Sequence, residues 1–234
     1  TLDGTLFPYT TLFRSDPRED RPGAAVDLPR TVTLATLAPM TIRALGISGS
    51  PRRVGNTSIL VNRCLDRLKA AGHQTHYESL AGKTLRGCNA CGNCSVSRNR
   101  QCMEITDDDF APLFEQMLAA DILIVGSPVH FGSATPELMA LLDRAGYVSR
   151  ANGGLLSRKL GGPIAVARRA GHNFTYAQLA LWYSINDMVL AGSSYWNVAL
   201  AREPGAVMQD QEALTTVDRF ADNLIWLASK LKSD

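Results

Sequence analysis

Four cysteines stand close together in the chain and have the spacing C-x2-C-x2-C-x7-C. Closely spaced thiolates can converge on one inorganic centre, and a run of cysteines with one more nearby is typical of [4Fe-4S] ligation. Zinc sites are usually built from two separated C-x2-C pairs, which this segment lacks. The pattern therefore predicts a cysteine-rich loop over residues 84–106 that holds a [4Fe-4S] cluster. Its expected ligands are Cys88, Cys91, Cys94 and Cys102.

The charge of this loop agrees with an anionic centre. Residues 80–103 contain Lys83, Arg86, Arg98 and Arg100 and no acidic side chain, so they would offset the negative charge of a four-thiolate cluster. Structural zinc, a redox disulfide and free thiols remain alternatives for the four cysteines. The fifth cysteine, Cys64, lies among apolar residues of a helical pattern, and we expect it to be a buried thiol.

A second segment, residues 46–58, is rich in hydrogen-bond donors and reads G-I-S-G-S-P-R-R-V-G-N-T-S. It follows an apolar run and opens a helical pattern, where backbone N–H groups and the helix dipole favour an anion. It lacks the P-loop lysine and the G-x-G-x-x-G fingerprint, so it is predicted to bind one terminal phosphate, such as that of FMN. A glycine- and serine-rich turn with a helix cap is the structural alternative. The expected donors are Ser48, Ser50, Asn56, Thr57 and Ser58, with Arg52 or Arg53.

Both segments need a scaffold, and from residue 41 the chain alternates β-rich runs with longer helical patterns. Strands are expected at 42–48, 74–80, 121–126 and 163–167, with a fifth within 189–198. Helices are expected at 57–71, 107–119, 136–147, 174–187 and 209–231. Asn56 or Thr57 is expected to cap the first helix. The pattern predicts an α/β protein with a flavodoxin-like, doubly wound, five-stranded parallel sheet in three α/β/α layers.

Two segments carry a more specific resemblance. S-G-S-P-R-x-x-G-N-T after the first strand, with G-S-P-V-H-F-G-S at residues 126–133, resembles the NADPH-dependent FMN reductase family and its iron-sulfur flavoprotein relatives. The cysteine spacing resembles the compact motif of that iron-sulfur branch, and the similarity runs from Met40 to the C-terminus. The resemblance implies that the isoalloxazine ring of FMN lies beside Pro128, Val129, His130, Phe131, Gly132 and Ser133, where His130 replaces a commoner tyrosine. It also implies that Arg168, Arg169 and Gly171 lie near the flavin pyrimidine edge, where positive charge would stabilise reduced flavin.

These features predict an FMN-dependent oxidoreductase that passes electrons between bound FMN and a [4Fe-4S] cluster. NAD(P)H is an expected electron donor, and a small molecule or a ferredoxin-like protein is an expected redox partner. No acid–base residue is needed, so no catalytic residue is predicted. One alternative is an NAD(P)H-dependent FMN or quinone reductase without a cluster. Another is a non-enzymatic module that binds a phosphoryl ligand or zinc.

The resemblance also implies a homodimer or homotetramer, because the flavin and the cysteine loop of related proteins meet across subunits. The sequence offers apolar side chains for such contacts. They are Leu155, Leu156, Phe174, Tyr176, Trp182 and Tyr183.

Composition excludes several other classes of protein. The formal net charge of the 234 residues is +2, so bulk charge points neither to nucleic acid nor to a membrane surface, and the apolar runs are too short to span a bilayer. Clustering of four of the five cysteines is unlike a secreted disulfide framework, and we expect a cytoplasmic protein.

Residues 7–15, F-P-Y-T-T-L-F-R-S, are similar to a translated sequencing adaptor. Residues 1–39 are therefore expected to be a non-native or disordered leader, followed by one FMN-binding domain over residues 40–234.

Overall fold

The computed structural model describes residues 42–231, which form an α/β domain on one parallel sheet. Its strands are β1 (Arg43–Ser48), β2 (Gln74–Ser79), β3 (Ile122–Pro128), β4 (Leu160–Ala167), β5 (Val189–Leu190) and β6 (Val198–Leu200). The strands follow the order β2-β1-β3-β4-β5, and β6 also pairs with β4. The flavodoxin-like fold predicted from the sequence is confirmed. The expectation for residues 1–39 lies outside the described residues.

The fifth strand expected within residues 189–198 is split in two. β5 pairs with the start of β4, and β6 pairs with its end. Between them, the Ala165 N–H donates to the Asn197 carbonyl at 2.9 Å, and the Asn197 side-chain amide donates to the Pro163 carbonyl at 3.2 Å. The amide of Asn197 thus replaces a ladder hydrogen bond where the strand is interrupted.

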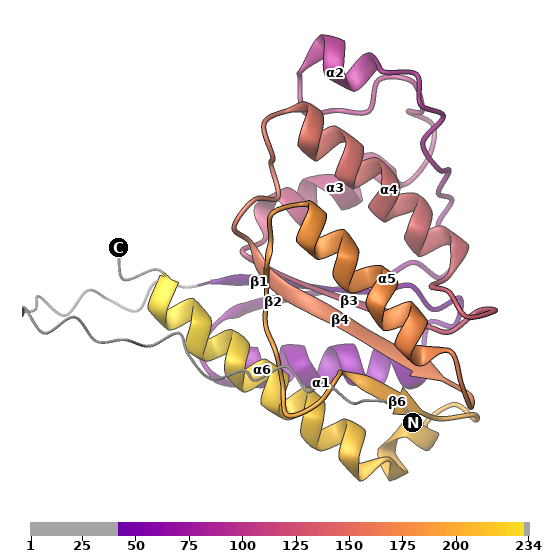
Figure 1. Cartoon of the computed structure of the whole chain (residues 1–234), viewed down its shortest axis with the longest axis vertical. Helices are drawn as coiled ribbons and strands as arrows, with labels where there is room; N and C mark the ends of the chain where they lie inside the picture. The colour runs from indigo at the N-terminus through magenta and orange to yellow at the C-terminus, as the bar shows by residue number, and fades with distance from the viewer. Residues whose placement is uncertain (1–41, 232–234) are drawn as a thin grey trace, which may run out of the picture. The chain divides into compact units, whose positions relative to one another are not determined.

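Helices cover both faces of the sheet (Figure 1). α1 (Asn56–Ala70) and α6 (Gln211–Leu231) pack on one face, while α3 (Phe110–Ala119), α4 (Pro136–Ala151) and α5 (His172–Ile185) pack on the other. In β3, Ile122 and Ile124 belong to the first apolar core, and Leu123 and Val125 belong to the second. A strand buried on both faces explains the continuous apolar run of β3. Within residues 42–231, no helix has both the length and the apolar character needed to cross a membrane.

The predicted N-cap residue of α1 is wrong. Its N-cap is Gly55 rather than Asn56 or Thr57. The Ser58 hydroxyl accepts the Gly55 N–H at 2.9 Å and donates to the Gly55 carbonyl at 2.8 Å. Since a serine three residues into the helix satisfies the cap from inside, the Asn56 side chain is free to bind another segment.

Two short elements complete the domain. α2 (Asn93–Ser97) lies in the cysteine loop, and the 3₁₀ helix η1 (Ala206–Gln209) precedes α6. α3 begins at Phe110, three residues later than expected from the sequence. Two aspartates before it bind backbone of the cysteine loop: Asp109 accepts the Thr84 N–H at 2.7 Å and Asp108 accepts the Arg86 N–H at 3.1 Å. Asp108 also accepts the Phe110 N–H at the start of α3, at 3.3 Å.

Candidate functional site

Loops after β1, β3 and β4 meet at the carboxyl ends of these strands, where ligands bind in open α/β sheets. They enclose a cavity of about 280 Å³, here called the loop cavity. The expected cofactor residues that line it are Ser50, Arg52, Asn56, Thr57, Pro128, Val129, His130 and Arg168. The sequence did not indicate its other lining residues, which are Pro51, Gly55, Val166, Ala201 and Arg202.

The loop after β1 places the start of α1 at the loop cavity. Ser50 and Thr57 are buried there, while Arg52 is exposed. Ser48 and Ser58 do not line the loop cavity, because their hydroxyls bind backbone N–H groups of the loop itself, those of Ser50 and Gly55. These contacts shape the turn, and the N-terminus of α1, which lines the loop cavity, has the backbone N–H groups and dipole that favour an anion.

Asn56 has a different role from the one expected. Its side-chain amide donates to the carbonyl oxygens of Ala201 at 3.4 Å and Glu203 at 2.9 Å. Its carbonyl oxygen accepts the Val207 N–H at 3.2 Å. The side chain therefore joins the start of α1 to the segment after β6, and this segment carries Arg202 into the wall of the loop cavity.

Arg53 points elsewhere and lines a groove along the outside of α1. The sequence left Arg52 and Arg53 as equal candidates for a phosphate contact. Of the two, the structure places only Arg52 at the loop cavity.

The loop after β3 forms a tight turn. His130 and Ser133 exchange backbone hydrogen bonds at 2.9 and 3.0 Å, and Phe131 and Gly132 between them have φ values of 51° and 81°. Positive φ at both central residues is the signature of a type I′ turn. The turn carries the Phe131 ring fully into solvent, and Phe131, Gly132 and Ser133 do not line the loop cavity. Its wall on this side consists of Pro128, Val129 and His130.

The loop after β4 contributes one side chain and one close contact. Arg168 lines the loop cavity, whereas Arg169 is exposed outside it. Gly171 has a φ of 87°, and a Cβ added there would lie 3.0 Å from Val129 Cγ1 and 3.2 Å from Gly132 Cα. A glycine at this position therefore lets the loop after β4 pack directly on the loop after β3.

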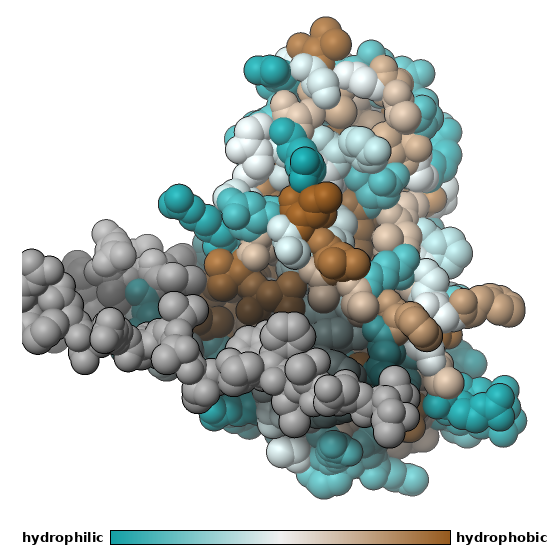
Figure 2. Space-filling model, viewed as in Figure 1, coloured by the Kyte–Doolittle hydropathy of each residue, from teal (hydrophilic) through white to brown (hydrophobic). Residues whose placement is uncertain are grey.

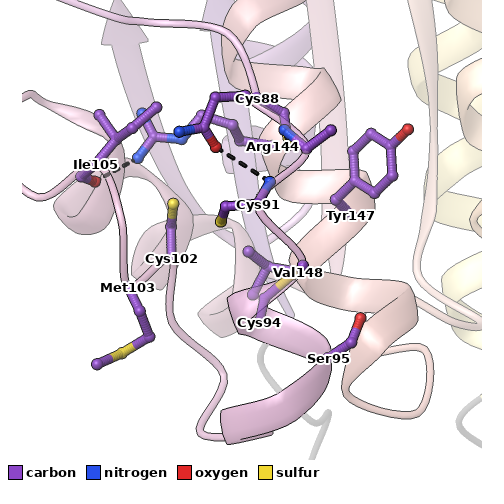
Figure 3. A pocket seen from close by; sticks show the side chains of 13 residues that line it. Cys88, Cys91, Cys94, Ser95, Cys102, Met103, Ile105, Arg144, Tyr147 and Val148 are labelled. Carbon is purple, nitrogen blue, oxygen red and sulfur yellow. Dashed lines mark hydrogen bonds between the residues drawn. The ribbon is translucent and has the colours of Figure 1, made fainter.

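All four clustered cysteines line a second pocket of about 150 Å³, here called the cysteine pocket (Figure 3). Cys91 is exposed, and the other three are half-buried. All five cysteines are free thiols in this structure. Cys64 is fully buried in the core, as expected. Arg144 and Tyr147 of α4 complete one wall of the pocket, together with Val148.

Within residues 42–231, no three His, Cys, Asp or Glu side chains are grouped closely enough to bind a single metal ion. The four cysteines surround a cavity instead of meeting at one point. Burial raises the pKa of the Cys102 thiol, but the nearby Ile105 backbone N–H and the positive charge of the Arg144 guanidinium outweigh it and lower the pKa overall. The pocket wall thus favours a thiolate at Cys102.

One helix connects the two cavities. At the start of α4, the Thr135 hydroxyl donates to the Gly49 carbonyl of the first loop at 2.8 Å, and the Thr135 N–H donates to Ser127 Oγ at 3.1 Å. Further along α4, the Asp143 carboxylate accepts the Cys88 N–H at 3.2 Å. The loop cavity and the cysteine pocket are therefore both positioned by α4.

Comparisons with known proteins agree with this geometry. A family model described as NADPH-dependent FMN reductase matches residues 42–203. An iron-sulfur flavoprotein of Methanocaldococcus jannaschii is 34% identical over 198 residues, which cover 82% of this chain and 100% of that protein. An iron-sulfur flavoprotein of Methanosarcina thermophila is 30% identical over 185 residues, which cover 78% of this chain and 93% of that protein.

Solved structures share the fold at lower identity. RosB, solved with bound 8-demethyl-8-formylriboflavin-5'-phosphate, superposes with a TM-score of 0.63 at 16% identity, covering 82% of this chain and 81% of that chain. A flavone reductase superposes with a TM-score of 0.60 at 18% identity, covering 82% of this chain but only 64% of that chain, less than two thirds of its length. These likenesses support the flavodoxin-like architecture.

The family match spans the three loops of the loop cavity and the whole cysteine motif. The relatives of 30% identity or more extend the similarity over nearly their full lengths. The chain therefore belongs to the NADPH-dependent FMN reductase family, in its iron-sulfur flavoprotein branch, and is an FMN-dependent oxidoreductase.

Proposed function

We propose that this oxidoreductase passes electrons between FMN in the loop cavity and a [4Fe-4S] cluster in the cysteine pocket. One observation carries the proposal: all four cysteines line one cavity, in a loop that is bound to α4, and the N-cap of the same helix is bound to the loop after β1 that lines the loop cavity. When bound, FMN supplies a carrier that exchanges two electrons or one, whereas a cluster exchanges one. The pair would couple two-electron donors to one-electron acceptors.

The residues of the loop cavity fit a phosphorylated, partly apolar group. The first N–H groups of α1 and the buried hydroxyls of Ser50 and Thr57 suit the terminal phosphate, and Arg52 adds a charge-assisted contact. Pro128 and Val129 offer an apolar wall for the ring. Arg168 and Arg202 bring positive charge to the loop cavity, which would stabilise the anionic reduced flavin.

The residues of the cysteine pocket fit a cluster better than zinc. A tetrahedral zinc ion needs four ligand atoms at about 2.0–2.3 Å from one point, and no such group exists within residues 42–231. Four thiols around a cavity of about 150 Å³ suit a centre of several atoms, in which each cysteine binds a different iron. The relatives named iron-sulfur flavoproteins support the same assignment.

NAD(P)H is the proposed electron donor, as the family description suggests. The acceptor is proposed to be a small molecule or a ferredoxin-like protein. We propose a cytoplasmic location, since five free thiols and an iron-sulfur centre suit a reducing compartment.

Self-association is proposed to occur through the outer face of α5, where apolar side chains gather on the surface (Figure 2). Phe174, Leu181 and Ile185 are 75%, 69% and 61% exposed, and their spacing puts them on one side of the helix. This set differs from the expected one. Leu156, Trp182 and Tyr183 are buried core residues and are not available for subunit contacts.

The function is tested on protein purified without oxygen. FMN, iron and acid-labile sulfide are measured per chain, and absorbance spectra are recorded before and after addition of NADPH. We expect one FMN, four iron and four sulfide per chain, with bleaching of both flavin and cluster bands. Zinc alone at one per chain would overturn the cluster, and bleaching of flavin without any iron would identify a cluster-free reductase.

A further inference from the structure

Arg144 is a buried cation at the wall of the cysteine pocket. Its side chain is 1% exposed and that of its partner Asp108 is 0% exposed, with 2.5 Å between Arg144 Nη1 and Asp108 Oδ2. The guanidinium also lies 4.0 Å from the centroid of the Phe110 ring. Burying an ion pair often adds little stability compared with apolar residues of similar volume. The position of this pair therefore calls for a role other than general stability.

The pair holds both ends of the cysteine loop. Arg144 donates to the Ile105 carbonyl at 2.7 Å and to the Arg86 carbonyl at 3.3 Å. Asp108 accepts the Arg86 N–H at 3.1 Å. Arg86 stands two residues before Cys88, and Ile105 stands three residues after Cys102. One guanidinium–carboxylate pair thus joins the entry of the loop to its exit.

Asp143 of α4 and Asn152, the residue that caps the end of this helix, each hold a single point of the loop. Asp143 accepts the Cys88 N–H at 3.2 Å, and Asn152 accepts the Arg100 N–H at 2.9 Å. Arg144 differs from them because it contacts both ends and also lines the pocket (Figure 3). Its buried Nε has no hydrogen-bond partner within residues 42–231, so one donor at the pocket wall remains unassigned.

We propose that Arg144 is a positioning residue that, with Asp108, closes the cysteine loop at its base and supplies positive charge to the thiolate-bound centre in the pocket. The closing role depends on the protein alone. The charge-stabilising role rests on the proposed cluster. A lysine cannot take over both roles, because its single ammonium group lacks the planar set of donors that reaches three acceptors.

The closing role is tested with the double variant R144Q/D108N, which removes both charges and leaves neither buried alone. The matched control is R63Q/D218N, since Arg63 forms a two-bond pair with Asp218 at 2.7 Å between α1 and α6. R144K is a second test of the closing role and replaces the double variant if circular dichroism and FMN content show that the double variant does not fold. Each purified protein is treated with trypsin, and cleavage at the exposed Arg98 and Arg100 is followed by mass spectrometry.

We expect cleavage within the loop to be at least about tenfold faster in R144Q/D108N than in the wild type, because local opening becomes easier. R63Q/D218N should match the wild type at these sites. R144K, which keeps the charge but loses the fork of donors, should also be cleaved faster. Wild-type cleavage rates in both Arg144 variants would overturn the closing role.

The charge-stabilising role is tested by the rate of iron loss to a chelator and by the midpoint potential of the iron centre, both without oxygen. We expect R144Q/D108N to lose iron about tenfold faster. We also expect it to have a lower midpoint potential than R63Q/D218N, because Arg144 lines the pocket and Asp108 does not. Unchanged iron loss and potential would overturn this role. If the purified wild type holds no iron and R144Q/D108N is still cleaved faster than the wild type, the closing role stands and the proposed cluster is contradicted. The failure of the proposal and the failure of the proposed cluster are therefore distinguishable.

Discussion

Thr135 occupies the N-cap of α4, but its hydroxyl donates to the carbonyl of Gly49, at 2.8 Å, instead of capping its own helix. Gly49 belongs to the loop that presents the start of α1 to the loop cavity. The hydrogen bond therefore joins the loop after β1 to the loop after β3, and both of these loops line the loop cavity. Because both groups are buried, removing the hydroxyl would leave a carbonyl without a partner.

Thr135→Val keeps the shape of the side chain and removes the donor. We expect the free energy of unfolding to fall by about 1–3 kcal/mol and the dissociation constant for FMN to rise about tenfold. Urea unfolding and fluorescence titration of the apoprotein with FMN measure the two effects. Thr215→Val on α6, where the exposed hydroxyl binds only Gln211, is the control and should bind FMN normally. Equal FMN affinity in the two variants would contradict the role of Thr135.

Gly171→Ala should affect FMN binding through a steric contact. The new Cβ would meet Val129 Cγ1 at 3.0 Å, so the second loop must move. Gly153 is a matched control, because its φ of 83° is similar and nothing lies within 4 Å of an added Cβ. Both variants should lose about 1 kcal/mol of stability from the positive φ. Only Gly171→Ala should also weaken FMN binding, and a similar loss in Gly153→Ala would disprove the contact.

Arg202→Gln tests the residue of the loop cavity that the sequence did not indicate. Arg202 lines the loop cavity, and removing its charge should lower the midpoint potential of the flavin, because the anionic reduced form loses stabilisation. FMN affinity should fall roughly fivefold at low salt and less at high salt. Arg169→Gln, in the same region but outside the loop cavity, should leave both values unchanged. Redox titration with a dye mediator measures the flavin midpoint potential of both variants. A larger drop in Arg169→Gln than in Arg202→Gln would contradict this assignment.

Cys64 should make stability depend on alkaline pH. Complete burial raises the pKa of its thiol well above the ordinary value of 9.0, so the folded state keeps the proton that the unfolded state releases. The contribution of this thiol to the free energy of unfolding is therefore constant below pH 9. Above pH 9 the free energy of unfolding declines by up to about 1.4 kcal/mol per pH unit. Urea unfolding at pH 8 and pH 10 measures the slope, which Cys64→Ala should reduce. Identical slopes would show that the thiol does not contribute.

Local sequence determined much of this protein. The apolar run of β3 predicts a strand buried on both faces, and the cysteine spacing predicts the loop that holds all four thiols around one pocket. The hydroxyl-rich turn after β1 predicts an anion site at the start of α1. These features depend on residues near one another in the chain, where spacing alone sets which side chains share a face or a turn.

Only the tertiary structure decided which side chains complete the two sites. Arg144 looks like an ordinary basic helix residue in the sequence, yet it bonds Arg86 and Ile105, 58 and 39 residues away. Asn56 binds the segment that carries Arg202, more than 140 residues later. Such partners meet because the sheet order and the packing of α4 and α1 bring distant loops together, and a hydrogen bond between distant residues has no periodicity that a sequence could display.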